Sequence, residues 1–446
     1  MLSELSPEII TIIWAVAVLA GVFTGYPVAL VLGGVGLIGG YFILGPTTVE
    51  ILYSRVFSLI QNYPLICVPL FILMGILLER SGLTDDLFEA LYIWFGGFRG
   101  GLAIGTILIG TLLAACLGII AASITILALT SLLPMLKRGY DRSFASGAIA
   151  AGGTLGILIP PSVMLVLYGP AAELSVGKLF MAAFLPGLLL ATLYCTYIAV
   201  RALLSPGVAP SISAEQTKDI NLRYKILILF KSLVPPLVLM ISVLGTIFLG
   251  IAPPTEAAAI GASAAVLMTI IYRKFSWQMF KEALLQTVKL CAFIMVIACC
   301  SYAFVGVVIR SGSARVIEDL ILAMPFGRWG AFGAVMFAVF ILGMLIDWIA
   351  IIFIVVPIVS PLLPVLGFDP LWFALMVCIN LQMGFMTPPF AQAIFILKGT
   401  APPEAGLTMS EIIRGVYPFV GLVAVGLVLC AIFPEIILWL PSRMIR

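Results

Sequence analysis

Long stretches without a charge dominate the sequence and limit the folds that it can adopt. Many of them reach the roughly 20 apolar residues that one helix needs to cross a bilayer, and some are about twice as long. Hydrophobic residues make up 63% of the chain and charged residues 10%, against about 45–50% and 25% in soluble domains. A water-soluble fold of this length needs more surface charge. The sequence therefore predicts an all-α, polytopic membrane protein.

Several other classes of protein are excluded by the same sequence. The chain has no histidine, which removes histidine-based nucleophiles, zinc sites and proton relays. Its eight cysteines lack metal-ligand spacing, and no phosphate-binding loop for ATP is present. Lysines and arginines form no basic stripe for nucleic acid. We therefore expect a transporter driven by a gradient or a partner, with no enzymatic activity, no organic cofactor and no nucleic-acid partner.

Most apolar tracts fit single crossings. The tract Ile9–Val49 is long enough for two, divided at Gly25-Tyr26-Pro27, because a proline lacks the backbone donor that would continue a helix. The other predicted crossings are Val56–Leu78, Leu179–Val200, Ser232–Gly250, Thr255–Tyr272, Leu290–Ile309 and Gly415–Pro434.

Two longer tracts predict re-entrant hairpins. The 37 uncharged residues between Arg99 and Lys137 would form a helix of roughly 55 Å, well beyond a hydrocarbon core of about 30 Å. A hairpin over about 100–136, with its tip near Gly118–Ser123, fits this length. The second hairpin is predicted over about 329–368, with Asp347 near its middle.

Two further tracts, 143–172 and 370–397, predict broken helices. Glycines and a proline pair interrupt the first at Gly152–Ser162 and the second at Met383–Ala391. Backbone groups without hydrogen bonds cost several kcal/mol each in lipid. Breaks of this kind are typical of ion and substrate sites in transporters.

The chain repeats its own pattern. Pro160-Pro161 recurs as Pro388-Pro389, 228 positions later, and Arg80-Ser81-Gly82 recurs as Arg310-Ser311-Gly312 after 230 positions. We infer two repeats, 1–210 and 225–446, joined by a polar cytoplasmic linker, 211–224. Each repeat would hold five crossings and one hairpin, and an odd number of crossings turns the second repeat upside down.

The distribution of the 23 lysines and arginines favours an N-terminus outside the cytoplasm. In this orientation most of them lie on the cytoplasmic side. The outside retains Arg55, Lys178, Arg310, Arg315, Arg328, Arg443 and Arg446.

Oxygen atoms at the hairpin tips and helix breaks are candidate ligands for sodium, because a hard cation prefers carbonyl, hydroxyl and carboxylate oxygens. The candidate sodium ligands are Ser123, Thr125, Gly153, Thr154, Gly156, Gly343, Asp347, Gly384, Thr387 and Pro388. Alternatively, the glycines only allow helices to pack closely.

Polar side chains beside the breaks are candidate contacts for an anionic substrate. These are Ser162, Asp347, Asn380 and Gln382. The alternatives are ordinary interhelical hydrogen bonds and, for Asp347, a structural contact with an arginine or a backbone amide. Glu256 follows Pro254 at a predicted helix start, where a carboxylate stabilises the positive end of the helix.

Four motifs extend this interpretation to a known family. They are Gly25–Leu30, Gly153–Ser162, Gly250–Ala259 and Thr387-Pro388-Pro389. With them the whole chain resembles the large membrane subunit of tripartite ATP-independent periplasmic (TRAP) transporters of the dicarboxylate and sialic-acid permease type.

The resemblance implies an elevator-type transporter of the bacterial inner membrane, in which two hairpins and two broken helices move against a scaffold. It implies a sodium gradient as the energy source and a small organic acid as the substrate. The implied partners are a small membrane subunit with four helices and a periplasmic substrate-binding protein. The alternative is a stand-alone sodium/carboxylate symporter of the same architecture.

Overall fold

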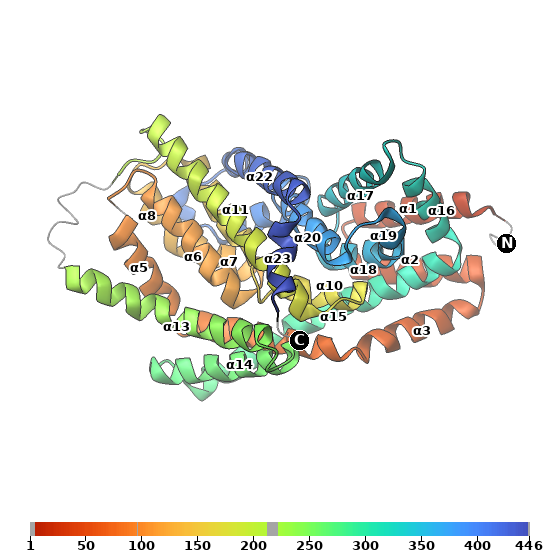
Figure 1. Ribbon diagram of the computed structural model, residues 1–446, viewed down its shortest axis with the longest axis horizontal. Coiled ribbons are helices and arrows are strands. Elements are labelled where there is room, and N and C mark those ends of the chain that lie inside the picture. The colour runs from red at the N-terminus through yellow and green to blue at the C-terminus, as the bar shows by residue number, and fades with distance from the viewer. Residues whose placement is uncertain (1–4, 96, 212–221, 445–446) are drawn as a thin grey trace.

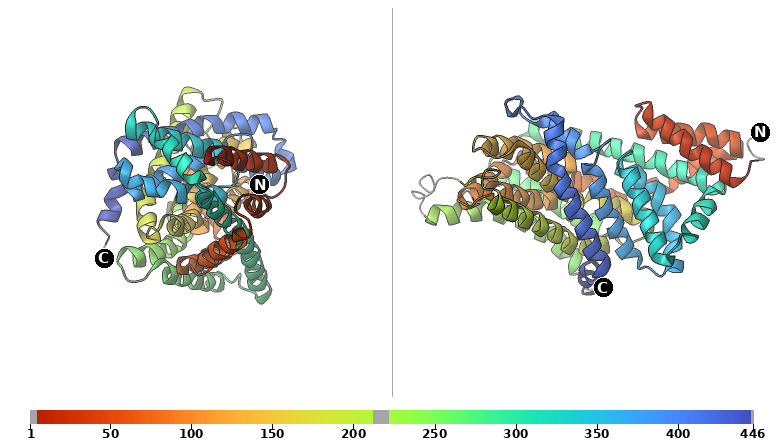
Figure 2. Two further views of the ribbon diagram at one scale, coloured as in Figure 1. Left: turned by 90° about the vertical axis from the view of Figure 1, so that its right-hand side faces the viewer. Right: turned by 90° about the horizontal axis from the view of Figure 1, so that it is seen from above.

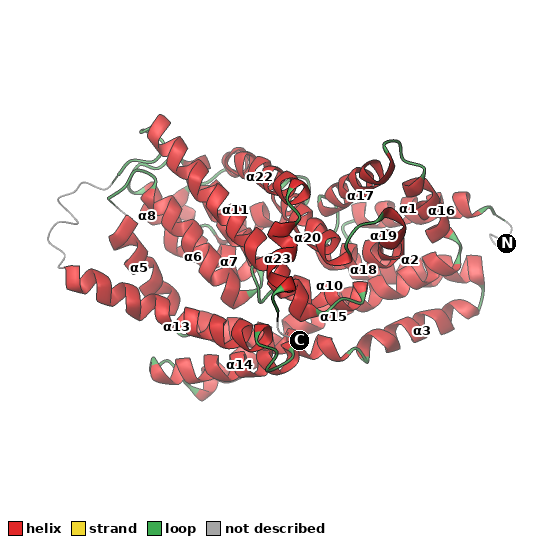
Figure 3. Ribbon diagram, in the orientation of Figure 1, coloured by secondary structure: helices red, strands yellow, loops and turns green. Residues whose placement is uncertain are grey.

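The computed structural model describes residues 5–95, 97–211 and 222–444. All regular elements within these residues are helical, as Figure 3 shows, and none of the described residues forms a strand. The prediction of an all-α protein is confirmed.

The first half of the chain contains two helices, a bent pair, one connecting helix, a hairpin, a broken helix and a long span. In order these helices are α1 (Pro7–Phe23), α2 (Val28–Leu44), α3 (Thr47–Ile60), α4 (Cys67–Arg80), α5 (Leu83–Phe95), α6 (Gly101–Leu117), α7 (Ile120–Leu127), α8 (Leu133–Leu136), α9 (Arg142–Thr154), α10 (Val163–Ala172) and α11 (Val176–Leu204).

The second half has a similar order of elements. Its helices are α13 (Leu222–Phe248), α14 (Pro254–Ile271), α15 (Trp277–Arg310), α16 (Ser313–Leu322), α17 (Gly327–Gly343), α18 (Trp348–Val359), α19 (Leu363–Leu366), α20 (Pro370–Met386), α21 (Gln392–Thr400), α22 (Met409–Ile432) and α23 (Glu435–Ser442). Glu256 lies in the first turn of α14, as predicted. The opposite orientation of the two halves in the membrane stays a prediction.

Seven segments in the described part of the chain are long and apolar enough to cross a membrane. They are Tyr63–Arg80, Val176–Leu204, Arg223–Phe248, Pro254–Ile271, Trp277–Arg310, Trp348–Leu366 and Met409–Ile432. Helices α1, α2, α6, α17 and α20 are shorter and also apolar. This content of apolar helices is that of a multi-pass membrane protein.

The molecule is elongated, and its broken helices lie near the middle of the long axis (Figure 1). Helices α5 and α8 lie toward one end, and α1 and α16 lie toward the other. Figure 2 shows the same arrangement from the end and from above. Around the middle, α10 packs against α18, α20 packs against α17 and α22, and α9 packs against α6, α7 and α22.

The predicted third crossing, Val56–Leu78, is wrong at its start. Helix α3 continues to Ile60, and a short 3₁₀ helix, Tyr63–Ile66, leads into α4. Asn62 is extended, and Pro64 has no N–H with which to continue α3. In the second half, α15 occupies the corresponding stretch as one unbroken helix of 34 residues.

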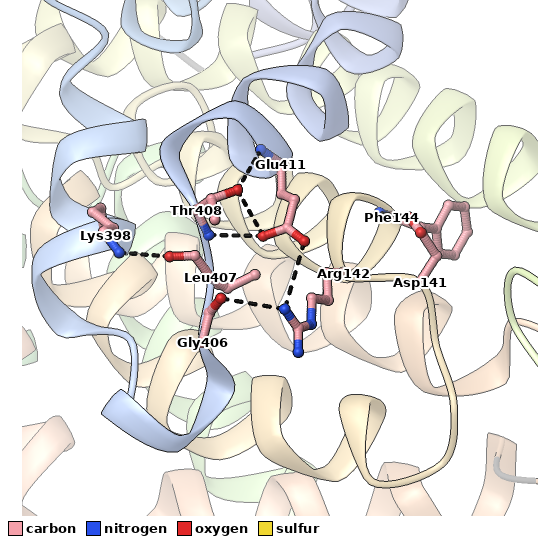
Figure 4. A network of polar contacts seen from close by, with 8 residues as sticks. All are labelled: Asp141, Arg142, Phe144, Lys398, Gly406, Leu407, Thr408 and Glu411. Carbon is pink, nitrogen blue, oxygen red and sulfur yellow. Dashed lines mark hydrogen bonds and ion pairs between the residues drawn. The ribbon is translucent and has the colours of Figure 1, made fainter.

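A polar network joins the two halves at one end of α9 (Figure 4). Arg142 Nη1 donates to the carbonyl of Gly406 at 3.3 Å and lies 3.7 Å from a carboxylate oxygen of Glu411. Glu411 also forms a capping box with Thr408 at the start of α22. Lys398 Nζ donates to the carbonyl of Leu407 at 2.5 Å. The loop before α22 is therefore tied both to α9 and to α21.

We expect Arg142→Ala to have only a small effect on stability. The ion pair is half exposed and long, and such pairs contribute about 0–1 kcal/mol. In detergent the midpoint of thermal unfolding should fall by no more than about 4 °C. A larger fall would show that this network determines how the two halves pack.

Candidate functional site

The two hairpin tips are short. In the first hairpin, α6 ends at Leu117, Gly118 adopts a left-handed conformation with φ of 61°, and α7 begins at Ile120. Ser123 therefore lies inside α7, so the predicted tip, Gly118–Ser123, is too long at its C-terminal end. In the second hairpin, residues 344–347 separate α17 from α18.

Both broken helices are interrupted at their proline pairs. Helix α9 passes through a 3₁₀ turn, Leu155–Ile157, before α10 begins at Val163. In the second half, residues 387–391 separate α20 from α21. Local hydrogen bonds hold the breaks, since Ser162 Oγ donates to the carbonyl of Ile157, and Thr387 Oγ1 donates to the carbonyl of Met383 at 2.8 Å.

Both tips and both breaks meet at one cavity of about 120 Å³. Helix α15 supplies the remaining wall. The lining residues are Gly118, Ile119, Ile120, Ala121, Ile157, Val163, Leu290, Phe293, Ile294, Asp347, Trp348, Ile349 and Gln392. This convergence of four discontinuous segments makes the cavity the candidate substrate site.

Four helices begin at the wall of this cavity. Ile120, Val163, Trp348 and Gln392 are the first residues of α7, α10, α18 and α21. The N-terminus of a helix carries a partial positive charge and free N–H groups, which favour an anion. None of the lining residues is a lysine or an arginine. Any attraction of this cavity for an anion therefore comes from the helix ends, and the carboxylate of Asp347 opposes it.

The preceding helices, α6, α9, α17 and α20, end at the same tips and breaks. A helix ends in carbonyl groups without intrahelical partners and in a partial negative charge. The same region therefore presents carbonyl oxygens to a cation and amide groups to an anion. This combination is the arrangement that transporters with broken helices use.

Asp347 is the only carboxylate among the residues that line the cavity. It is 7% exposed and caps α18, where its Oδ1 accepts a hydrogen bond of 2.9 Å from the N–H of Ile349. The structural contact considered as an alternative is therefore present. The contact leaves the carboxylate at the cavity wall, and its role toward an ion or a substrate stays a prediction.

Gln382 and Thr154 join the two broken helices. The Nε2 of Gln382 donates to Thr154 Oγ1 at 3.2 Å and to the Tyr194 hydroxyl at 3.3 Å. Gln382 and Thr154 are 228 positions apart, as are the two proline pairs. The predicted inverted repeat would place such a contact at its local two-fold axis. All three residues are buried, and none lines the cavity.

The candidate glycines lie at close contacts between a break and a hairpin. A Cβ built on Gly384 would lie 2.9 Å from backbone atoms of Gly343, and one on Gly153 would lie 3.1 Å from the backbone of Ile124. At these positions the glycines therefore allow a break and a hairpin to pack closely, which is the alternative to ion binding given above. Gly156 lies beside Ser123, whose hydroxyl is 3.2 Å from the position of such a Cβ.

Of the predicted site residues, only Asp347 lines the cavity. The contacts of three others show where their side chains go instead. Thr125 lines an adjoining cavity of about 230 Å³ together with Glu79 and Gln286. The two cavities share Ile119, Ala121 and Leu290. Asn380 Nδ2 donates to the carbonyl of Met336 at 2.6 Å, which is the interhelical bond considered as its alternative. Ser162 stands next to the cavity residue Val163, but its hydroxyl is turned to Ile157.

Sequence reasoning missed Gln392. It lines the cavity, and its Oε1 is buried with no hydrogen-bond partner among the described residues. Its signal in the sequence is its position as the first polar residue after the second proline pair. An unpaired buried amide oxygen is costly, so we expect a bound ion or substrate to satisfy it.

Comparisons with known proteins agree with this geometry. Residues 15–436 match the family model of the DctM component of tripartite ATP-independent periplasmic transporters. The C4-dicarboxylate TRAP transporter large permease protein DctM of Pseudomonas aeruginosa is 30% identical, over 91% of this chain and 93% of that protein. The 2,3-diketo-L-gulonate TRAP transporter large permease protein YiaN of Escherichia coli is 28% identical, over 96% of this chain and 98% of that protein.

A solved structure supports the fold. The crystal structure of the Alcanivorax borkumensis YdaH transporter superposes with a TM-score of 0.61 at 15% sequence identity, and the match covers 98% of this chain and 99% of the other. At this identity the likeness concerns the fold alone.

Broken helices, two hairpins and a cavity lined by helix N-termini, in a chain with seven described segments long and apolar enough to cross a membrane, together define a multi-pass membrane transporter. The chain belongs to the family of large permease subunits, or DctM components, of TRAP transporters. The predictions of family and of a transport function without enzymatic activity are confirmed by the relatives, which are named as permeases.

Proposed function

We propose that this protein imports a small organic acid together with sodium. The observation that carries the proposal is the convergence of four helix N-termini on one cavity without a basic side chain. Relatives are named for C4-dicarboxylates, sialic acid, isethionate, 2,3-diketo-L-gulonate and ectoine. An anionic group of the substrate, a carboxylate or, as in isethionate, a sulfonate, seated at the N-termini of α10 and α18 fits both the chemistry and this range of names.

Asp347 supplies a physical reason for coupling to a cation. Two carboxylates about 4 Å apart repel each other by about 4 kcal/mol at an effective dielectric constant of 20. A substrate carboxylate therefore enters a cavity that already holds Asp347 far more readily when a cation binds beside it.

Ligands for such a cation lie nearby. Carbonyls at the ends of α9 and α20 and the hydroxyls of Ser123 and Thr387 are of the type that sodium prefers. Ser123 lies beside Gly156, and Gly343 lies beside Gly384, so each break has oxygen atoms from a hairpin next to it. We assign sodium as the coupling ion on this basis.

The mechanism that we propose is an elevator, in which the hairpins and broken helices move as one body. The hydrogen bond between Gln382 and Thr154 ties the two halves of this body together. Two repeats of opposite orientation would allow the body to expose its cavity alternately on either side.

We further propose that the chain works in a bacterial inner membrane with its N-terminus in the periplasm. Its partners would be a small membrane subunit with four helices and a periplasmic substrate-binding protein. The stand-alone symporter is not favoured, because the relatives are named as permease proteins of TRAP transporters.

Uptake into proteoliposomes tests this proposal. The chain, its small subunit and its binding protein are reconstituted, and the acids for which the relatives are named are offered as radiolabelled substrates. We expect at least one of them to accumulate under an inward sodium gradient and not under an equal potassium gradient. Accumulation that is equal under both gradients would contradict sodium coupling, and full activity of the chain alone would contradict the assigned partners.

A further inference from the structure

A second cavity, of about 660 Å³, lies away from the hairpins and broken helices. It is enclosed by α3, the C-terminal end of α15 and the start of α16. Three arginines, Arg55, Arg310 and Arg315, line it together with Ser54 and Glu318. We propose that this cavity binds the headgroup of an anionic phospholipid.

The charge of the cavity favours an anion. Among the described residues, none of the three arginines forms an ion pair with a carboxylate. Arg55 is held over the Tyr302 ring, with its guanidinium carbon 5.4 Å from the ring centroid. Three arginines against one glutamate leave the lining with a net positive charge. A guanidinium group binds phosphate through two parallel hydrogen bonds, so several of them around one cavity suit a phosphodiester.

The start of α16 adds to this preference. Gly312 caps this ten-residue helix in a left-handed conformation, and Gly312 and Ala314 both line the cavity. The N–H of Arg315 donates to the carbonyl of Gly312 at 3.2 Å, and the N–H groups of Ser313 and Ala314 at the start of the helix remain for an anion, which the helix dipole favours. The anion would therefore meet backbone donors as well as guanidinium groups.

The surroundings of the cavity point to a lipid as the source of the anion. On the opposite face of α3, Tyr53, Phe57 and Ile60 are exposed, and the rings of Tyr53 and Phe57 stack at 5.7 Å. Tyrosine is enriched at the boundary between the acyl chains and the headgroups, so the exposed Tyr53 places this face of α3 at that boundary. In the predicted orientation the cavity opens toward the periplasmic leaflet, and its arginines suit the phosphate of an anionic lipid headgroup there.

Native mass spectrometry of the full chain in detergent tests this inference. Phosphatidylglycerol is titrated against the protein, with zwitterionic phosphatidylcholine as the lipid control. We expect the variant Arg55→Gln/Arg310→Gln/Arg315→Gln to bind phosphatidylglycerol at least about tenfold more weakly, with no change toward phosphatidylcholine. The variant Arg99→Gln/Arg414→Gln/Arg443→Gln removes the same charge at exposed positions elsewhere and should bind as the parent does.

The single variant Arg315→Gln provides a milder change at an exposed position, with an expected loss of about twofold. Equal binding by the parent and the triple variant would overturn the inference. An equal loss in the control variant would also overturn it, since net charge alone would then explain binding. If inorganic phosphate displaced the lipid at equal concentration, the cavity would be a site for free anions and not for a lipid.

Discussion

Transport by the variant Gly384→Leu is expected to fall to background. The α-carbon of Gly384 faces the end of α17, and a Cβ at this position would lie 2.9 Å from the Cα and carbonyl carbon of Gly343. Because the obstructing atoms belong to the backbone, no rotation of a side chain can make room. The second hairpin must move away from the second break, and the cavity that they build together is lost.

Uptake in proteoliposomes measures this effect, and Gly421→Leu is the matched control. Gly421 lies in α22 and is exposed, and a Cβ added there would meet no neighbouring element within 4 Å, so a leucine should face lipid. We expect Gly421→Leu to transport normally. Substantial uptake by a well-folded Gly384→Leu protein would show that the contact between hairpin and break is unnecessary.

The variant Asp347→Asn is expected to raise the sodium concentration for half-maximal uptake by at least about tenfold. Asparagine is as good an N-cap residue as aspartate, so α18 should keep its cap. The negative charge at the cavity wall is removed, and with it the electrostatic reason for a cation beside the substrate. Sodium dependence of uptake, measured at saturating substrate, reports the change.

Asp369→Asn is the matched control, because Asp369 caps α20 through hydrogen bonds to the N–H groups of Leu371 and Trp372 and does not line the cavity. Its sodium dependence should equal that of the parent. Asp347→Ala should in addition lose about 1 kcal/mol of stability with the cap. Unchanged sodium dependence in Asp347→Asn would reduce the role of this carboxylate to capping.

Much of the fold was predictable because lipid imposes strict lengths on helices. An uncharged tract of 37 residues cannot be one crossing, and the structure divides it into α6 and the helices that follow Gly118. Proline pairs mark the breaks, since a proline offers no donor to a helix. The bend before α4 was missed because the tract between Arg55 and Glu79 carries no charge, although Gln61, Asn62 and Pro64 interrupt its apolar residues.

The site was predictable as a region and less so as a set of side chains. The repeat places both breaks and both tips in register, but not the direction in which each side chain points. Ser123 and Thr125 are two positions apart on α7, yet Ser123 lies beside Gly156 and Thr125 lines the adjoining cavity of about 230 Å³. Asn380 looked equivalent to Gln382 in the sequence, although its amide is used in a bond to α17.

A cryo-EM structure of the complex with sodium and the transported acid tests the central claim most directly. We expect density for the acid in the cavity between the hairpin tips and the helix breaks, with its carboxylate about 3 Å from backbone N–H groups that begin α10 or α18. Density for the acid at a lysine or arginine side chain elsewhere, with this cavity empty, would contradict the account.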